Sequence, residues 1–252
     1  MEDPQLFQFD LPVFFADCDS SGQWKPATAF RVLGEAAGGH AEILGFGYQD
    51  SLADGLFWVL SRIKIYFLAY PRFGQTVTVC TWPKNLQQRL FFARDYEVLN
   101  ESGERLLAAT ALWVIISSKT RRIQPPERMR LERLPFSGQA ALDEQLMKLN
   151  HSETAEPLSL HRVGYSDIDL LGHANNTRYI EWICDSFPSE QFETQEVDAM
   201  QINFERELRT GDVVAINHAS LEGGGRSYIQ GINQDGNLRS FEAEIQWRAR
   251  GA

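Results

Sequence analysis

The sequence predicts an α+β fold in which a unit of one long helix and about five antiparallel strands occurs twice. First, a shift of 150 residues places the loop 17–22 over the loop 167–172, and both loops have the pattern D-x-D-x-x-G. Second, each loop leads into a segment whose apolar residues recur at helical spacing. Third, segments of alternating hydrophobicity, separated by turn residues, follow each helix. The length of 252 residues suits two units of about 100–150 residues.

The helix of the first half is expected to begin near Pro26, since proline is favoured at the first helical position, and to end near Leu44. Gly38 and Gly39 inside it each cost about 1 kcal/mol relative to alanine, which is acceptable where a closely packed sheet needs small residues. The residues of its apolar stripe are Phe30, Leu33, Ala37, Ala41 and Leu44. The expected strands are 57–69, 75–82, 91–99 and 105–117, with turns at 70–74 and 100–103.

The helix of the second half is expected to have Asn175 or Asn176 as its N-cap and Pro188 as its stop signal. The expected strands are 200–206, 213–220, 228–233 and 238–247, with turns at 209–212 and 233–236. Residues 134–160 lack this alternation, and within them 140–149 could form a short amphipathic helix. We therefore predict an N-terminal domain at 1–134, a connector at 135–158 and a C-terminal domain at 159–252.

The composition argues against several classes of protein. A net charge of −10 argues against nucleic-acid binding, which depends on cations that neutralise phosphates. No apolar run approaches the roughly 18 residues that a membrane span needs, and the acidic start MEDPQLFQFD lacks the features of a secretory signal. The scattered Cys18, Cys80 and Cys184 argue against a disulfide framework and a zinc site. We therefore expect a cytoplasmic protein that binds no metal. The sequence contains no P-loop, dinucleotide fingerprint or G-x-S-x-G motif, so we expect no cofactor and no α/β-hydrolase site.

One basic segment interrupts this acidic chain. Residues 119–133, with the sequence KTRRIQPPERMRLER, contain six cations and two anions and so carry a charge of +4. On an acidic protein such a segment is a candidate docking patch for an acidic partner. The alternative is a solvated connector without a partner.

The second D-x-D-x-x-G loop carries an unusual density of polar groups. Asp167, Asp169, His173, Asn175 and Asn176 occupy ten residues and are followed at once by an apolar helical segment. The start of a helix presents unpaired N–H groups and about half a positive charge. Carboxylates, an imidazole and amides beside it could polarise a carbonyl and steer a water molecule, which indicates a hydrolase site. The alternative is that Asp169 and Asn175 are only turn and capping residues.

Five further segments of the chain are distinctive: LGEAAGGH (33–40), GLFWVLSR (55–62), YPRFG (70–74), LWVI (112–115) and TRR (120–122). Through these segments and the second loop, the chain resembles the acyl-acyl carrier protein thioesterases over nearly its whole length. The resemblance implies a tandem (double) hot-dog fold, in which two long helices are each wrapped by a curved antiparallel sheet. It also implies hydrolysis of fatty acyl-acyl carrier protein to free fatty acid in fatty-acid biosynthesis.

The resemblance also implies the site residues. The family's catalytic Asp and His fall on Asp169 and His173, and the Glu of a following strand falls on Glu207. The family's Asn-Asn pair falls on Asn175 and Asn176, which would position the substrate or the oxyanion. We expect Glu207 to be the general base on water, His173 to aid orientation and proton transfer, and Asp169 to fix the tautomer of the His173 ring. The thioester oxygen would face backbone N–H groups at the start of the helix.

Two positions depart from the family's pattern. Leu171 replaces an Asn between the Asp and the His, so a backbone N–H or Asn175 would have to substitute for its amide. Leu208 replaces a Cys often found after the Glu, which favours a carboxylate and water over a thiol nucleophile. None of the cysteines present has a His or an acid at the spacing of a catalytic motif.

The first half lacks the chemical groups of the second. Gln23 stands in place of His173, Lys25 and Pro26 replace Asn175 and Asn176, and Tyr70 occupies the place of Glu207. We therefore expect the first half to bind the acyl chain. Candidate lining residues are Phe57, Trp58 and Leu60. For any one of these three, a place in the ordinary core is the alternative, and we expect His40 to be a packing histidine.

The acyl donor is expected to be acyl carrier protein, docked on Arg121, Arg122 and Arg128 of the basic segment. A thioesterase for acyl-coenzyme A would share the site and would not need this segment. Two further candidate functions are that of a non-catalytic acyl-binding protein, which the loss of the amide at Leu171 would favour, and that of a hot-dog hydratase or dehydratase. Chain-length preference stays open, as does the choice between a monomer and a homodimer.

Overall fold

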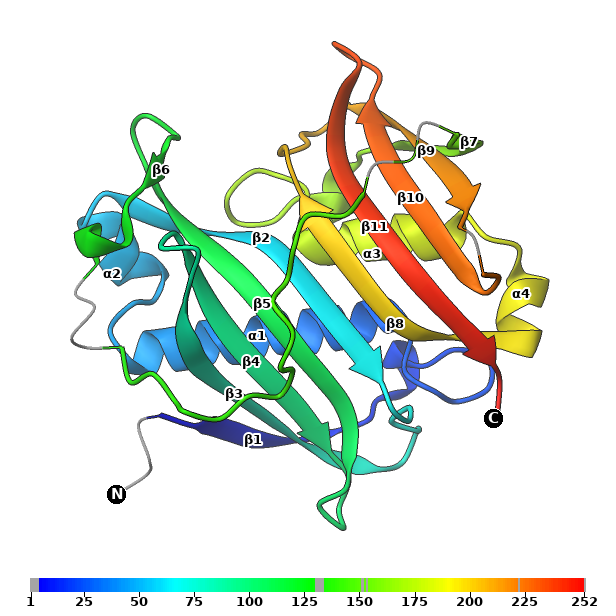
Figure 1. Ribbon diagram of the computed structural model, residues 1–252, viewed down its shortest axis with the longest axis horizontal. Helices are drawn as coiled ribbons and strands as arrows, with labels where there is room; N and C mark the ends of the chain where they lie inside the picture. Colours follow the sequence, from blue (N-terminus) through cyan, green and yellow to red (C-terminus); the bar gives the residue numbers. More distant parts are fainter. Residues whose placement is uncertain (1–4, 130–133, 151, 153, 222, 252) are drawn as a thin grey trace. The chain divides into compact units, whose positions relative to one another are not determined.

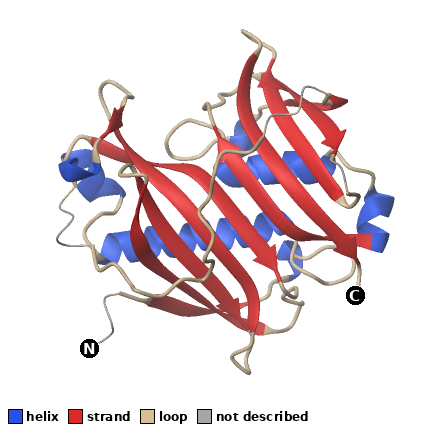
Figure 2. Ribbon diagram, viewed as in Figure 1, coloured by secondary structure: helices blue, strands red, loops and turns tan. Residues whose placement is uncertain are grey.

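The computed structural model describes residues 5–129, 134–150, 152, 154–221 and 223–251. The chain folds as two compact units, Met1–Leu146 and Met147–Ala252, and the division lies within the predicted connector. Each unit combines one main helix and one short helix with an antiparallel sheet (Figure 2). Among the described residues, no helix combines the length and the apolarity that crossing a membrane requires.

The first unit contains a long helix, α1 (Pro26–Ile43), and five strands of an antiparallel sheet in the order β1-β3-β4-β5-β2 (Figure 1). The bounds of the strands are β1 (Phe7–Pro12), β2 (Leu56–Phe67), β3 (Thr76–Gln87), β4 (Phe91–Leu99) and β5 (Arg105–Ser117). A two-residue strand, β6 (Ile123–Gln124), pairs with β5. The remaining elements are α2 (Tyr48–Ala53) and two 3-10 turns, η1 (Phe15–Asp17) and η2 (Pro126–Arg128). These bounds confirm the predicted helix and strands of the first half.

Helix α1 buries the face that carries Ala29, Phe30, Leu33 and Ala37. Gly39 lies on its side toward β1, where a Cβ atom would come within 3.2 Å of the Phe7 Cζ atom. A Cβ at Gly38 would meet no atom within 4 Å. Close packing therefore explains the glycine at position 39 and does not explain the one at position 38.

The second unit repeats this plan with a shorter helix, α3 (Asn176–Asp185), and a five-stranded antiparallel sheet in the order β8-β11-β10-β9-β7 (Figure 1). The bounds of the strands are β7 (Glu156–Arg162), β8 (Gln195–Phe204), β9 (Val213–Ser220), β10 (Arg226–Asn233) and β11 (Leu238–Ala249). A 3-10 turn, η4 (Tyr165–Asp167), precedes α3, and the short helix α4 (Ser189–Thr194) follows it. The α3 side chain of Tyr179 packs edge-on against Phe204 and Phe241 of the sheet, at 5.5 and 5.3 Å between ring centroids. The strands predicted for this half are confirmed.

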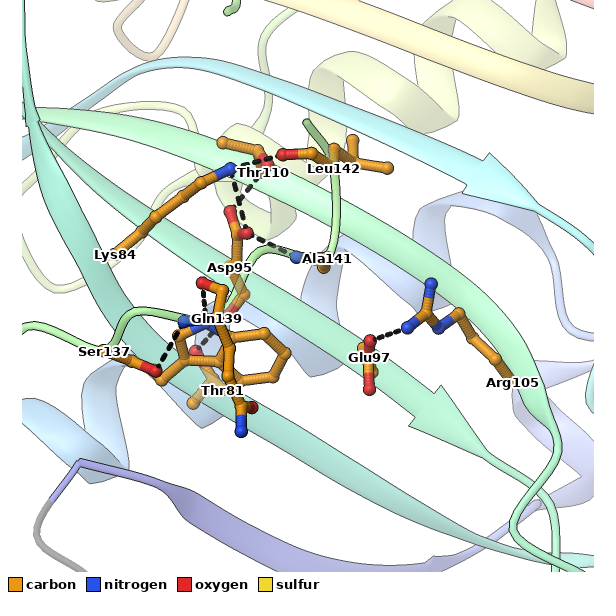
Figure 3. Close-up of polar contacts among 11 residues, drawn as sticks. Thr81, Lys84, Asp95, Glu97, Arg105, Thr110, Ser137, Gln139, Ala141 and Leu142 are labelled. Atoms are coloured by element: carbon orange, nitrogen blue, oxygen red, sulfur yellow. Dashed lines mark hydrogen bonds and ion pairs between the residues drawn. The ribbon is translucent and has the colours of Figure 1, made fainter. Parts of the chain in front are cut away.

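The predicted helix at 140–149 is wrong, because this segment forms a loop with bends and contains no helical turn. Figure 3 shows how its first part is held by polar groups of the first unit's sheet. The fully buried Asp95 carboxylate accepts hydrogen bonds from the Thr110 hydroxyl and the Ala141 N–H, both at 2.6 Å, and pairs with Lys84 at 3.2 Å. Lys84 also donates to the Leu142 carbonyl. Two backbone groups at the start of the segment are thus satisfied by sheet side chains in place of helical hydrogen bonds.

Candidate active site

A tight turn projects His173 from the second D-x-D-x-x-G loop. The Asp169 N–H donates to the His173 carbonyl at 2.9 Å, and the Gly172 N–H donates to the Asp169 carbonyl at 3.0 Å. Gly172 has a φ of +76°, in the left-handed region that glycine adopts without a steric penalty. The Asp169 carboxylate accepts the Leu171 N–H at 2.9 Å. Asp and Gly thus shape the turn that presents the imidazole.

The structure brings His173 together with Glu207, which lies 34 residues further along the chain. The imidazole Nε2 and the carboxylate Oε2 are 2.9 Å apart. A backbone hydrogen bond of 2.8 Å, from the Ala174 N–H to the Leu208 carbonyl, joins the residues that follow each of them. The His173 side chain is 14% exposed and that of Glu207 39% exposed, so water can reach the carboxylate.

The start of α3 forms the third part of the site. Asn175 is the N-cap, and its side-chain oxygen accepts the Thr177 N–H at 2.9 Å, which confirms one of the two predicted caps. The Asn175 N–H donates to the Asp167 carbonyl and the Arg178 N–H to the Asn175 carbonyl. Among the N–H groups at this helix start, the one of Asn176 has no acceptor among the described residues. It is therefore open to a ligand.

Asp169 and Leu171 are both held within the turn. The Leu171 N–H and the side-chain oxygen of Asn175, two groups that could have replaced the missing amide at position 171, are used inside the loop. The Leu171 side chain is exposed. The Asp169 carboxylate acts as a turn group here, and its effect on the tautomer of the His173 ring stays a prediction.

The loop of the first unit has the same backbone without these chemical groups. Its Asp19 N–H donates to the Gln23 carbonyl at 2.8 Å, and its Gly22 N–H donates to the Asp19 carbonyl at 3.0 Å. The Trp24 N–H donates to the Pro71 carbonyl at 2.9 Å, which is the counterpart of the bond from Ala174 to Leu208. Tyr70 therefore stands where Glu207 stands in the second unit. It is buried and stacked on Phe67, with ring centroids 4.8 Å apart.

The three predicted lining residues of the first unit all have packing partners. Trp58 lies edge-on to Phe92 at 4.9 Å between ring centroids and donates its Nε1–H to the Phe46 carbonyl at 3.1 Å. Phe57 is stacked near Tyr48, and Leu60 is buried. These contacts fit the alternative that the three residues belong to the ordinary hydrophobic core. Their role in lining an acyl-binding site stays a prediction.

His40 is buried within the first unit, where its Nδ1 lies 3.0 Å from Arg94 Nη1. Because a guanidinium only donates hydrogen bonds, Nδ1 must be the acceptor. The Phe7 ring is stacked near the imidazole, at 5.7 Å between centroids. These contacts agree with a packing role for His40.

The basic segment is only partly described, because residues 130–133 lie outside the described range. Arg121 has a φ of +57°, and its guanidinium lies 5.9 Å from the centroid of the Phe57 ring. The Arg122 carbonyl accepts the Ser117 N–H, and Arg128 closes the turn η2. The role of these three arginines in docking is not tested by these contacts.

Two residues beneath the second loop, Asp167 and His161, have no individual role among the residues predicted from the sequence. The Asp167 carboxylate lies 3.2 Å from His161 Nε2 and accepts the Gly164 N–H at 2.7 Å. The shift of 150 residues that aligns the two halves also sets His161 over Leu11. This change from an apolar to a titratable residue was a signal that comparison of the halves could have found.

The cysteines offer no nucleophile. Burial raises the pKa of the Cys184 thiol to about 12 and that of the Cys80 thiol to about 11, and it also raises the pKa of Cys18. Since the thiolate is the reactive form, these residues are inert near neutral pH. At the position after Glu207, the fully buried Leu208 leaves no thiol.

The chain is similar in sequence to plant acyl-carrier-protein hydrolases. It is 29% identical over 240 residues to the chloroplastic acyl-[acyl-carrier-protein] hydrolase FATB3 of Cuphea viscosissima, which covers 89% of this chain and 58% of that protein. It is 34% identical over 200 residues to the chloroplastic palmitoyl-acyl carrier protein thioesterase of Gossypium hirsutum, which covers 74% of this chain and 48% of that protein. The chain thus spans about half the length of these curated relatives.

Solved structures have the same fold. An acyl-ACP thioesterase from Bacteroides thetaiotaomicron gives a TM-score of 0.87 at 23% identity, covering 96% of this chain and 98% of that one. The 12:0-ACP thioesterase from Umbellularia californica gives 0.86 at 23% identity, covering 99% of both chains. The acyl-ACP thioesterase N-terminal domain matches residues 4–129, and the acyl-ACP thioesterase C-terminal domain matches residues 150–249. The chain has the predicted double hot-dog fold and belongs to the acyl-ACP thioesterase family.

Proposed function

We propose that this protein hydrolyses the thioester of fatty acyl-acyl carrier protein and releases the free fatty acid. The observation that carries the proposal is the 2.9 Å distance between His173 Nε2 and Glu207 Oε2, beside a helix start with an open N–H. Membership of the family and the names of the plant relatives supply the substrate class.

The Glu207 carboxylate is the general base. It removes a proton from a water molecule as the water oxygen bonds to the thioester carbon, a role typically worth 10²–10⁴-fold in rate. Its exposure gives water access, and its pairing with His173 holds one oxygen in place. When the carbon–sulfur bond breaks, the proton passes through the His173 ring to the leaving thiolate. The products are the fatty acid and the thiol of the carrier.

The oxyanion that forms in the transition state is stabilised by the Asn176 N–H at the start of α3. This donor is the one at the helix start that the described residues leave open, and the helix dipole adds positive potential at the same place. One such donor is typically worth about 2.7–4 kcal/mol of transition-state stabilisation. The Asn175 side chain caps the helix and so fixes where this N–H lies.

The first unit has Gln23 in place of the His173 imidazole and Tyr70 in place of the Glu207 carboxylate. In this proposal it binds the acyl chain, with Phe57, Trp58 and Leu60 as lining residues. Arg121, Arg122 and Arg128 attract the acidic carrier protein. A cytoplasmic location and the choice between a monomer and a homodimer stay predictions.

The test is a turnover profile over saturated acyl lengths, with each acyl group attached in turn to acyl carrier protein and to coenzyme A. Wild type and Glu207→Gln are compared, with the tail of the acyl group as the only variable within each series. We expect hydrolysis of carrier-protein thioesters that Glu207→Gln lowers by about 10²–10⁴-fold. Binding of acyl groups without turnover would overturn the proposal in favour of a non-catalytic acyl-binding protein.

The preference for carrier protein is tested with the triple charge reversal Arg121→Glu, Arg122→Glu and Arg128→Glu. We expect a higher KM for acyl-carrier protein and little change with acyl-coenzyme A. Faster turnover of the coenzyme A series by wild type, with no effect of the reversals, would identify an acyl-coenzyme A thioesterase and contradict the docking role.

A further inference from the structure

We propose that Asp167 and His161 are positioning residues, which lock the second D-x-D-x-x-G loop onto α3 and thereby set the geometry of His173, Glu207 and the Asn176 N–H. This inference rests on the proposed hydrolysis. Neither residue contacts the reacting atoms in the mechanism above.

Asp167 ties three elements together beneath the loop. Its carboxylate accepts the Gly164 N–H at 2.7 Å, His161 Nε2–H at 3.2 Å from β7, and the indole Nε1–H of Trp182 at 3.4 Å from α3. Its carbonyl accepts the Asn175 N–H at 2.8 Å. Asp167 is 7% exposed, so the carboxylate itself is largely shielded from water, which strengthens these bonds.

The side chains of Asp167, His161 and Trp182 contact one another. The His161 ring lies on the Trp182 ring with centroids 4.2 Å apart and planes 23° apart. Burial alone would raise the pKa of Asp167, but the hydrogen bonds from Gly164 and His161 lower it below the ordinary carboxyl value. The carboxylate is therefore ionised at neutral pH and accepts from all of its donors.

The first unit shows that the turn itself does not need this arrangement. There the Lys25 N–H donates to the Asp17 carbonyl at 3.0 Å, as the Asn175 N–H does to Asp167. The Asp17 carboxylate instead pairs with the Arg31 side chain at 2.7 Å in an exposed ion pair. Leu11 and Val32 occupy the places of His161 and Trp182. The same backbone loop thus forms without an imidazole or an indole beneath it.

The extra side-chain bonds of the second unit fix the position of Asp167, whose backbone in turn positions the groups used in catalysis. The bond from the Asn175 N–H to the Asp167 carbonyl sets the residue directly before Asn176, whose N–H is the open donor. His173 lies two residues before Asn175 in the same loop. A misplacement of about 1 Å at a catalytic group can cost about 10²-fold in rate. The contacts of Asp167 with His161 and Trp182 would prevent such a shift in the second unit, where the proposed reaction occurs.

The test compares His161→Leu, which introduces the residue of the first unit, with His161→Gln, whose side-chain amide can still donate to Asp167. A second variant, Asp167→Asn, replaces the carboxylate that accepts these hydrogen bonds, and Asp17→Asn is its matched control in the first loop. Steady-state kcat and KM are measured with acyl-carrier protein, and folding is followed by thermal unfolding. We expect His161→Leu and Asp167→Asn to lower kcat by about 10²-fold with KM nearly unchanged. We expect His161→Gln to recover most of kcat and Asp17→Asn to leave it near wild type.

A role in folding alone would lower the unfolding temperature without lowering the kcat of the folded protein. The proposal is overturned if folded His161→Leu retains wild-type kcat, or if His161→Gln is as slow as His161→Leu. If Asp167→Asn does not fold, the two His161 variants decide the matter. Failure of the proposed function is distinct, because wild type itself would then show no turnover that depends on Glu207.

Discussion

The two D-x-D-x-x-G loops of this chain share their backbone and differ in their side chains. In both, the second Asp and the Gly close the same turn, with corresponding hydrogen bonds that agree within about 0.1 Å. Only the second loop presents an imidazole, paired at 2.9 Å with a carboxylate, whereas the first presents Gln23 beside the buried Tyr70. The comparison separates the groups that build the turn from those that supply chemistry. Three pairs of positions carry the chemical difference: 23 and 173, 26 and 176, 70 and 207.

The largest effect is expected when the imidazole of the second loop is replaced by the residue found in the first loop. We expect His173→Gln to lower kcat by about 10²–10⁴-fold, because the ring that orients Glu207 and returns the proton is lost. The loop should stay folded, since Gln23 supports the same turn. Turnover of acyl-carrier protein and thermal unfolding measure the two effects. The reciprocal Gln23→His is the control, and a His173→Gln enzyme near wild-type rate would contradict the assignment.

A second exchange concerns the start of the helices. Pro26 begins α1 and has no N–H, whereas Asn176 begins α3 and has an open one. We expect Asn176→Pro to lower kcat by about 10²–10³-fold through loss of an oxyanion donor, with the helix intact because proline suits this position.

Asn176→Ala is the matched control for this exchange, since it removes the side chain and keeps the N–H. If Asn176→Ala is as slow as Asn176→Pro, the side chain is the group that acts and the backbone assignment fails.

The buried Asp167 predicts a pH dependence of stability in the second unit. Its pKa is lowered from 3.8 in the folded protein, so its ionised form stabilises the fold above the pKa of the unfolded chain. This contribution is lost as the pH falls through the folded pKa. We expect Asp167→Asn to be less stable than wild type at pH 7 and the difference to shrink as the pH falls below 3.8. Urea unfolding at pH 7 and below pH 3.8 checks this, and an equal difference under the two conditions would contradict the lowered pKa.

The smallest expected effect concerns helix length. Pro188 stands in the second half where Gly38 stands in the first, and α3 ends before it while α1 continues through Gly38 and Gly39. Gly38→Ala should raise the free energy of unfolding by about 1 kcal/mol, because its surroundings are open. Gly39→Ala should gain less or lose stability, because its Cβ would lie 3.2 Å from the Phe7 ring. Chemical denaturation of the two variants measures the difference in their free energies of unfolding. Equal gains would show that the Phe7 side chain moves to make room for the new methyl group.

Much of the fold could be predicted because its signals are local. Pro26 at the start of α1, Asn175 as the cap of α3 and the alternating strands depend on neighbours within a few residues. The segment 140–149 failed as a prediction for the opposite reason. Asp95 and Lys84, which are distant in sequence, hold its Ala141 N–H and its Leu142 carbonyl from the sheet.

The duplication can be read directly from the amino-acid sequence, and so can the helix starts and the two Asp-Gly turns, which arise from short-range backbone preferences. The contact between Glu207 and His173 depends on long-range packing, because a backbone hydrogen bond between Ala174 and Leu208 joins two segments that lie 34 residues apart in the chain. The tertiary structure also decided that Asp167 is a buried junction of β7 and α3 while Asp17 lies in an exposed ion pair. The same residue type in the same motif has different surroundings, and long-range packing sets them.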